Sequence, residues 1–317
     1  MLIWLLSCAA TPEITAPVAV APKEPVATVL APDPTAPSPV SPASPPALWP
    51  APARLVAIGD LHGDVTSAML ALKLGGLVDD HGTWVGGTSW LVQTGDVLDR
   101  GRNGPSMLTF LGGLETEAAA AGGKVIVLDG NHELMNLQGD WRYVADFAEF
   151  PGATEEARTA ARKAWMSPTG DGGKWVLSHG ITVQIGDTVF VHGGIDSNWA
   201  SHGIAGLNAL AFADPRNAQS LVLGPDGPLW NRAYLLEDPV AICPELSRAL
   251  ATLGARRMVV GHTTQDSGRI ATRCDGELYG IDTGISAYYG VHPSALVITH
   301  AAGQPDVVTA LPTPGGG

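Results

Sequence analysis

Five short motifs carry the side chains that could do chemistry, and they share one pattern. Each motif follows an apolar run and combines glycine with carboxylate, amide or imidazole side chains: GDLHGD (59–64), GDVLDRG (95–101), GNHE (130–133), VHGG (191–194) and GHTT (261–264). Glycine beside a polar residue lets the backbone turn tightly and approach a bound group closely. The candidate metal ligands in these motifs are Asp60, His62, Asp96, Asn131, His192 and His262.

Taken singly, each of these residues has a structural explanation. Asp60 could cap the helix that follows it, and Asp96 could form an Asx turn. A lone histidine is more often a satisfied structural residue than a ligand. The coincidence of five such strand ends changes this, because an open α/β sheet brings the carboxyl ends of its strands to one edge.

The ligand types indicate which ions would bind there. Asp, His and Asn side chains without thiolate suit borderline to hard divalent ions, so we expect two metal ions, with manganese as the first choice and iron or zinc as alternatives. Two ions about 3.5 to 4 Å apart lower the pKa of a bridging water and balance phosphoryl oxygens during an in-line displacement. The expected chemistry is hydrolysis of a phosphate ester.

Strands and helices must alternate to position these motifs. RLVAI (54–58), SWLVQ (89–93) and KVIVL (124–128) are short apolar strands, and helical stretches follow at 65–78, at 105–122 and, as ELMNLQGDWRYV, at 133–144. Such βαβ units predict a parallel central sheet with right-handed crossovers. The stretch 174–194 predicts an antiparallel meander of short strands, and strands return after a helix at PELSRALATLG (244–254).

Composition bounds the class of protein. The chain has 317 residues, 45% hydrophobic and 15% charged, which is ample for a packed core. Its formal net charge of -13 argues against a nucleic-acid partner, because such partners are bound by clustered Lys and Arg. No apolar run of about 18 residues is present to span a bilayer as a helix.

The first 53 residues differ from the rest. Residues 1–8 resemble a lipoprotein signal that ends at Cys8, and residues 9–53 form a Pro- and Ala-rich linker ahead of a catalytic domain at 54–317. Lipidation at Cys8 would place the protein in a bacterial cell envelope, lipid-anchored or periplasmic; an ordinary apolar start would leave it cytoplasmic. Cys243 and Cys274 could form a disulfide or stay unpaired.

The order of the five motifs resembles the phosphoprotein phosphatases of the calcineurin-like metallophosphoesterase superfamily. More narrowly, GNHELMNLQGDWRYV, PLWNRAYL and RRMVVGHTTQ resemble the Shewanella-like protein phosphatases, and the match covers roughly residues 54 to 300. The resemblance implies an α/β fold: a β-sandwich of mixed sheets with βαβαβ units, flanked by helices in four α/β/β/α layers. It also implies a phosphoprotein or phosphopeptide substrate and attack by a dimetal-bound hydroxide without a phosphoenzyme.

The resemblance assigns roles residue by residue. Asp60, His62 and Asp96 would hold one metal, and Asp96, Asn131, His192 and His262 the other. His132 would be the general acid for the leaving oxygen, and Asp99 would hold its imidazole. Arg100, Arg232 and Asn131 would contact the phosphate. Alternatively, Arg100 pairs with Asp99 and Arg232 is a surface arginine. Glu133 is expected to be a helix-start carboxylate and not a catalyst.

The motifs are also compatible with two other functions. A dinucleoside tetraphosphate hydrolase uses related motifs, and an inactive lipoprotein could keep the fold as a binding module. The motifs do not separate phosphoserine and phosphothreonine from phosphotyrosine. Specificity would depend on the depth of the cleft, where the insert between Asp146 and Lys174 is expected to form a helical lip. Neither the oligomeric state nor the physiological substrate follows from the sequence.

Overall fold

The computed structural model describes residues 46–217 and 219–311. The expected signal at 1–8, with Cys8, and the linker as far as residue 45 lie outside the described residues. Residues 46–53, which were also expected to be linker, contain strand β1 (Leu48–Trp49), which pairs in parallel with β5. Within the described part of the chain, no helix is long and apolar enough to cross a membrane.

Two β-sheets form the centre of the catalytic domain. The five-stranded sheet has the order β11 (Val307–Leu311), β10 (Ala295–Thr299), β2 (Arg54–Ile58), β3 (Trp90–Gln93) and β4 (Lys124–Val127). The six-stranded sheet has the order β1, β5 (Thr182–Ile185), β6 (Thr188–Val191), β7 (Arg257–Val260), β9 (Leu278–Gly280) and β8 (Ala271–Arg273). Strands β2, β3 and β4 are parallel, as the sequence predicts, whereas β10 is antiparallel to both of its neighbours.

Alternation along the strands divides the core into two layers. Leu55 and Ala57 of β2 belong to an inter-sheet cluster with Phe190 and Val259 of the other sheet. Val56 and Ile58, whose side chains point to the opposite face, belong to the cluster that includes the helices. Because successive strand residues face opposite sides, one apolar run can serve both layers.

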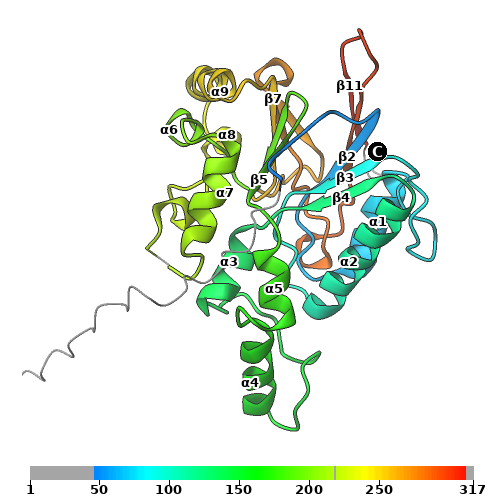
Figure 1. Cartoon of the computed structure of the whole chain (residues 1–317), viewed down its shortest axis with the longest axis vertical. Coiled ribbons are helices and arrows are strands. Elements are labelled where there is room, and N and C mark those ends of the chain that lie inside the picture. Colours follow the sequence, from blue (N-terminus) through cyan, green and yellow to red (C-terminus); the bar gives the residue numbers. More distant parts are fainter. Residues whose placement is uncertain (1–45, 218, 312–317) are drawn as a thin grey trace, which may run out of the picture. The chain divides into compact units, whose positions relative to one another are not determined.

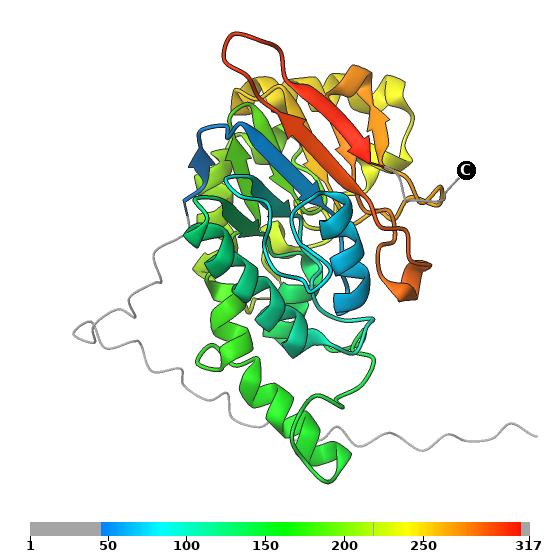
Figure 2. The same ribbon diagram turned by 90° about the vertical axis from the view of Figure 1, so that its right-hand side faces the viewer.

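Helices cover the outer faces of both sheets (Figures 1 and 2). Helices α1 (Val65–Leu74) and α2 (Gly104–Ala120) lie over the five-stranded sheet. The helices on the other side are α6 (Ser197–Ala200), α7 (Gly203–Ala213), α8 (Ala233–Leu236) and α9 (Pro239–Leu253). Short 3₁₀ helices occur at Leu221–Leu223, Cys274–Gly276 and Ala287–Tyr289. The four-layer α/β/β/α sandwich is confirmed.

Two segments differ from the sequence prediction. Helix α3 (Asn131–Gln138) ends at Gly139, whose φ of 82° is left-handed, so GDWRYV does not continue the helix. Residues 174–177, predicted as a strand, belong to helix α5 (Asp171–Leu177). A short apolar run such as KWVL fits a buried helix turn as well as a strand, and its packing decides between them.

The expected insert is helical. Helix α4 (Glu155–Trp165) and the loop before it project away from the sheets (Figure 1), and α5 returns the chain to the sandwich. Elsewhere, Cys243 of α9 and Cys274 form a disulfide with a Cα–Cα distance of 5.3 Å. The structure therefore selects the disulfide over the two unpaired cysteines that the sequence left open.

Candidate metal centre

The strand ends deliver the candidate ligands to one buried place. Asp60 and His62 follow β2, Asp96 follows β3, Asn131 begins α3 after β4, His192 follows β6 and His262 follows β7. All six residues are buried. The two sheets contribute from the carboxyl ends of their parallel strands, which is where open α/β sheets place ligands.

Asp96 lies at the centre of this site. Its carboxylate oxygens are 3.8 Å from His62 Nε2, 3.7 Å from His132 Nε2 and 3.3 Å from His192 Nε2. Two groups of potential metal-binding atoms, each within 4.8 Å of one another, therefore share this aspartate: His62, Asp96 and His132, and Asp96, His192 and His262. A carboxylate with imidazoles on two sides is the arrangement that a bridging ligand requires.

Two histidine rings are oriented to leave a lone pair free. His62 Nδ1 lies 3.1 Å from the carbonyl oxygen of Leu98, and His192 Nδ1 lies 2.9 Å from that of Thr94. A carbonyl oxygen only accepts, so each Nδ1 carries the proton and donates it. Each Nε2 is then a lone-pair donor that faces Asp96. Such a backbone partner is what fixes the tautomer of a metal-binding histidine.

The second group brings several electron donors close together. His192 Nε2 lies 2.9 Å from Asn131 Oδ1 and 3.1 Å from His262 Nδ1. Burial first, and then the neighbouring His192, hold the pKa of His262 well below its usual value, so the ring is neutral. His262 Nε2 is buried and has no hydrogen-bond partner among the described residues. Converging lone pairs repel one another unless a cation lies between them, so this donor set suits a divalent metal ion.

Asp60 lies beside the two groups, not within them. Both of its carboxylate oxygens accept a hydrogen bond from the backbone N–H of His262 at 3.2 Å. Burial, followed by the charges of Asp282 and Asp96, raises the pKa of Asp60 well above its ordinary value. Three buried carboxylates facing one centre are the electrostatic situation that a bound cation relieves.

Asp282 is a site residue that the sequence reading missed. It is buried, follows β9, and accepts hydrogen bonds from Thr264 Oγ1 at 2.7 Å and from the backbone N–H of Gly284 at 3.1 Å. Burial raises its pKa, and the charge of Asp96 adds to that effect. The signal was available, because LYGID repeats the pattern of an apolar strand, a glycine and then an aspartate.

The backbone around these residues is locally unfavourable. Positive φ angles occur at five residues that the sequence singled out: His62 (46°), Asp96 (56°), Asp99 (68°), Arg100 (62°) and His262 (63°). Left-handed conformations of non-glycine residues cost free energy and concentrate at functional sites. Gly130 shows why glycine is needed beside them, since a Cβ there would lie 2.2 Å from Asp96 Oδ1.

His132, a member of the first of these groups, also forms a pair with the carboxylate of Asp99. His132 Nδ1 is 2.8 Å from Asp99 Oδ2, and Asn136 Nδ2 donates to both Asp99 oxygens at 3.0 Å. Burial alone would lower the pKa of His132, but the charge of Asp96 and the hydrogen bond and charge of Asp99 together raise it. The ring can therefore hold a proton on Nε2, which faces the centre.

Glu133 stabilises this arrangement through hydrogen bonds with the backbone. It is fully buried and accepts hydrogen bonds from the backbone N–H groups of Gly130 (2.7 Å), Asp96 (2.9 Å) and Leu98 (2.9 Å). It thus serves as the carboxylate of a capping box at the start of α3, which confirms the helix-start reading. It also connects α3 to the loop that carries Asp96.

The two arginines that were expected to bind phosphate have different environments. Arg100 stacks on the ring of Tyr143, with its Cζ 3.9 Å from the centroid, and donates to Tyr288 Oη at 3.4 Å. Among the described residues, the arginine that pairs with Asp99 is Arg162 and not Arg100. The distance from Arg162 Nη2 to Asp99 Oδ1 is 3.3 Å. Arg232 donates to the carbonyl oxygen of His262 at 2.5 Å, so this exposed arginine lies at the edge of the site.

Aromatic rings border the site on three sides. Tyr143 lies 5.0 Å from the His132 ring, Tyr289 5.3 Å from His62, and Trp230 5.5 Å from His262. Aromatic faces favour contact with flat apolar groups. Each of the three rings therefore lies beside one histidine of the centre.

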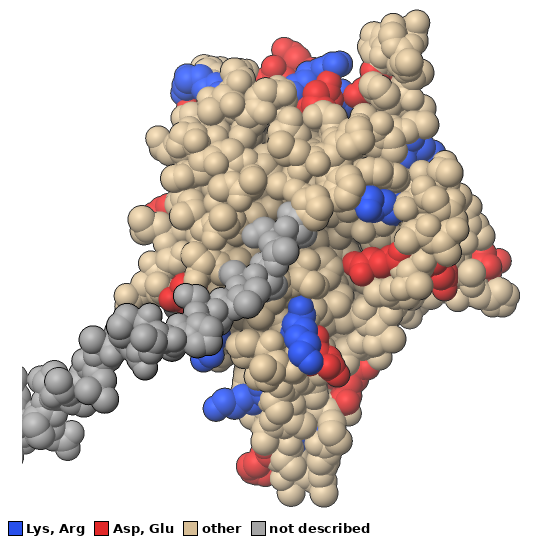
Figure 3. Space-filling view, in the orientation of Figure 1, with Lys and Arg blue, Asp and Glu red and all other residues tan. Residues whose placement is uncertain are grey.

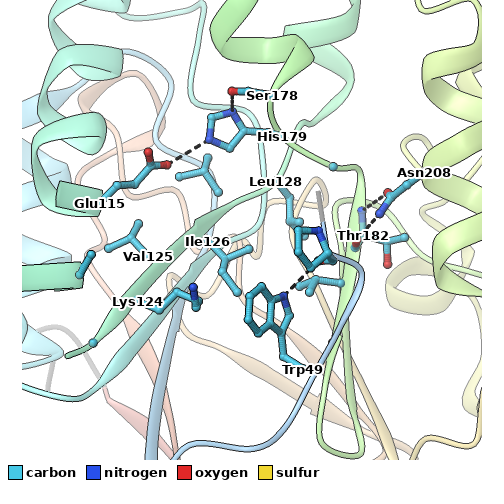
Figure 4. A pocket seen from close by; sticks show the side chains of 16 residues that line it. Trp49, Glu115, Lys124, Val125, Ile126, Leu128, Ser178, His179, Thr182 and Asn208 are labelled. Atoms are coloured by element: carbon cyan, nitrogen blue, oxygen red, sulfur yellow. Dashed lines mark hydrogen bonds and ion pairs between the residues drawn. The ribbon is translucent and has the colours of Figure 1, made fainter. Parts of the chain in front are cut away.

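A separate cavity of about 350 Å³ contains none of the five motifs' ligands. Figure 4 shows that it is lined by β4, by Trp49, and by the ion pair of His179 with Glu115, whose atoms are 3.0 Å apart. His179 also contacts the carbonyl oxygen of Trp175. This histidine, outside the motifs, is accordingly a structural residue.

Comparisons with known proteins agree with this geometry. Residues 53–266 match the model of the calcineurin-like phosphoesterase family. The chain is 36% identical to Shewanella-like protein phosphatase 2 of Arabidopsis thaliana, over 74% of this chain and 72% of that protein. It is 32% identical to Shewanella-like protein phosphatase 1 of Plasmodium berghei, over 74% and 68%. Among solved structures, a cold-active protein-tyrosine phosphatase of a psychrophilic Shewanella species superposes with a TM-score of 0.71 at 26% identity, covering 84% of this chain and 83% of that one.

Proposed function

The chain belongs to the calcineurin-like phosphoesterase family, and its relatives include Shewanella-like protein phosphatases. We propose that it hydrolyses phosphomonoesters on phosphoproteins. Members of this family are metal-dependent phosphatases, and we assign the same activity to this chain. The observation that carries the finer proposal is Asp96, whose carboxylate lies close to His62 and also belongs to a group with His192 and His262, while His132 pairs with Asp99. Two metal-binding groups and one proton donor are what hydrolysis of a phosphate ester needs.

The donor set is that of two divalent ions. We assign Asp60, His62 and Asp96 to one ion, and Asp96, Asn131, His192 and His262 to the other, with manganese first and iron or zinc as alternatives. When bound, the ions supply Lewis-acid stabilisation of phosphoryl charge and a water of lowered pKa. The buried imidazoles of His62 and His192, whose Nδ1–H groups donate to carbonyl oxygens, and the raised pKa of Asp60 support this assignment.

The other residues handle the ester itself. Arg100 and Arg232, with the amide of Asn131, bind the phosphate oxygens, which suits planar guanidinium groups. His132 gives the proton on Nε2 to the leaving oxygen as the P–O bond breaks. Asp99 keeps the His132 ring oriented through Nδ1 and stabilises its charged form. The aromatic residues narrow the entrance and limit the water that reaches the ester.

The aromatic border favours phosphotyrosine within this class. Tyr289 and Trp230 border the site where an aromatic leaving group could contact them, whereas a serine side chain is too short to do so. The solved relative described above is named as a protein-tyrosine phosphatase. We therefore expect a phosphotyrosine peptide to be hydrolysed faster than serine or threonine peptides of the same sequence.

A matched peptide panel tests the proposal. The manganese-loaded protein is assayed with three phosphopeptides that differ only in the phosphorylated residue, and with diadenosine tetraphosphate. Hydrolysis of the peptides with a higher kcat/KM for phosphotyrosine is expected. Equal rates on all three peptides would remove the aromatic preference. Faster cleavage of the dinucleotide than of any peptide would favour the dinucleoside tetraphosphate hydrolase, and no turnover of any substrate would favour an inactive binding protein.

The roles of Asp96 and His132 separate in a second test. Asp96→Asn should lose bound metal and activity together, because this carboxylate lies in both ligand groups. His132→Asn should keep the metal and slow kcat by about 10² to 10⁴, the range of general acid catalysis. Metal content by elemental analysis and steady-state rates are the measurements. Loss of metal from His132→Asn would mean that this histidine is a ligand.

A further inference from the structure

Helix α4 buries an arginine where a surface helix normally buries apolar residues. Arg162 is the buried residue of Glu155–Trp165, with only 4% of the residue exposed. A guanidinium group loses much of its hydration at such a position and is found there only when it is paired. The sequence singled out no residue of this helix, and the roles assigned above do not use Arg162.

The contacts of Arg162 lead to the proposed proton donor. Its Nη2 lies 3.3 Å from Asp99 Oδ1 and also donates to Asn136 Oδ1 in a short hydrogen bond. The other oxygen of Asp99 holds His132 Nδ1 at 2.8 Å. A continuous path therefore runs from α4 through Arg162 and Asp99 to His132.

Aromatic rings hold the arginine in place. The Arg162 Cζ lies 5.9 Å from the ring centroid of Phe147 and 5.6 Å from that of Phe150. Both phenylalanines belong to the loop that precedes α4 within the projecting insert (Figure 1). The guanidinium is thus held between these rings and Asp99, and its position depends on how the insert packs.

The positive charge of Arg162 compensates the buried charge of Asp99 in the His132–Asp99 pair. The Asp99 side chain is completely buried, and His132 alternates between a charged and a neutral ring during turnover. When His132 is neutral, an unpaired Asp99 would be a buried charge without compensation. Arg162 supplies a positive charge beside Asp99 at that moment, and its other described contacts are with Asn136, Phe147 and Phe150.

We propose that Arg162 is a positioning residue of the reaction, which holds Asp99 so that His132 keeps the ring orientation needed to donate its proton. The docking of α4 then becomes a condition for proton donation. This inference rests on the proposed role of His132. In the step itself, the oxygen of the attacking hydroxide forms the new bond to phosphorus, the bonding pair of the ester P–O bond goes to the leaving oxygen, and that oxygen takes the Nε2 proton. His132 becomes neutral, and Arg162 keeps all its protons.

A series of aryl phosphates with different leaving groups tests this inference. Proton donation matters most for a basic leaving group such as phenoxide and least for 2,4-dinitrophenoxide, which leaves without help. Arg162→Met should lower kcat on phenyl phosphate by about 10- to 100-fold, part of the full effect of general acid catalysis. Its kcat on 2,4-dinitrophenyl phosphate should change less than about threefold. KM and metal content should stay near those of the unaltered protein.

Two further variants of the same helix frame the result. Arg162→Lys keeps the charge but loses the planar fork, so it should restore part of the lost rate on phenyl phosphate. Lys163→Met removes the charge of the next residue, which is exposed, and should leave the whole series unchanged. If Arg162→Met does not fold, Arg162→Lys is measured instead. A kcat that falls more steeply with the basicity of the leaving group than it does in the unaltered protein supports the inference. An unchanged dependence overturns it.

The double variant separates this inference from the proposed function. In a His132→Asn background, Arg162→Met should cause little further loss on phenyl phosphate, because both changes act through one proton. Equal losses across the series for Arg162→Met, or losses that multiply in the double variant, would overturn the inference. If His132→Asn itself affects all esters equally, the general-acid role fails first. If His132→Asn is selective and Arg162→Met is not, only the role of Arg162 fails.

Discussion

Asp96 shows how one residue can organise a whole site. Its backbone carbonyl accepts hydrogen bonds from the N–H groups of Leu61 (3.0 Å) and His62 (2.9 Å), and its own N–H donates to Glu133. Its side chain accepts from the N–H of His132 at 3.1 Å. Burial opposes ionisation, but His192 and His132 outweigh it and hold the pKa of Asp96 well below its ordinary value. The carboxylate is therefore charged and fixed before any ligand binds.

The Glu133 carboxylate should matter more for stability than any ligand. Glu133→Ala leaves three buried N–H groups without an acceptor, and each costs about 1 to 3 kcal/mol, so we expect a loss of about 3 to 9 kcal/mol in the free energy of unfolding. Glu133→Gln keeps one acceptor and should lose less. Urea denaturation of the metal-free protein measures both. A loss below about 1 kcal/mol for Glu133→Ala would contradict the supporting role.

The sequence could indicate motif residues but not their supporting partners. Each motif follows a strand, and strands of one parallel sheet end at one edge, so Asp60, Asp96 and Asn131 could be brought together by reasoning alone. Arg162 could not, because it lies 63 residues from Asp99 in a segment without a motif. Whether an arginine on a helix points inward depends on packing that no local pattern encodes.

At the scale of elements, strand identity was easier to predict than strand order. The run ALVIT (295–299) is predicted as a strand and lies antiparallel to β2 and β11, but its pairing with β2 joins residues about 240 apart in the chain. Residues 174–177 show the opposite difficulty, since the segment is local but its apolar run is too short to distinguish a helix from a strand. Length and alternation decided the long elements correctly.

The loop between β10 and β11 is tied to the other sheet by Asp306. This carboxylate lies 2.8 Å from Arg257 Nη2, at the start of β7, and 2.7 Å from His300 Nδ1. Partial burial opposes ionisation, but the hydrogen bond from His300 and the charge of Arg257 lower the pKa of Asp306. A carboxylate whose pKa is lower in the folded state stabilises the fold above its unfolded pKa, about 3.9.

Asp306→Asn should therefore lose stability in a pH-dependent way. We expect a loss of about 1 kcal/mol at pH 7, since one side of the cluster is exposed to solvent. The difference from the unaltered protein should shrink as the pH falls through about 4 and below, where Asp306 itself becomes protonated. Urea denaturation across this range is the measurement, with the exposed Asp214→Asn as the control. A difference that stays constant with pH would show that charge is not its cause.

At the scale of the whole molecule, the net charge influences how fast charged substrates approach. The chain carries 31 acidic and 18 basic residues, and its formal net charge is -13. On the face shown in Figure 3, acidic and basic side chains are scattered among uncharged residues. A phosphate group is itself anionic, so the negative field opposes its approach; in the proposed function, Arg100, Arg232 and the metal ions would offset this repulsion at short range.

Peptides with basic residues around the phosphate should accordingly be the better substrates at low salt. A phosphopeptide flanked by Lys or Arg should have a kcat/KM about 10-fold above one flanked by Asp or Glu near 0.01 M ionic strength, where the Debye length is about 30 Å. At about 1 M salt that length is about 3 Å, and the ratio should approach unity. Uncharged flanks should lie between the two, and p-nitrophenyl phosphate, measured alongside, corrects for effects of salt on turnover itself. A preference that persists at high salt would mean that specific contacts beside the metal centre, not the field of the whole molecule, select the flanking residues.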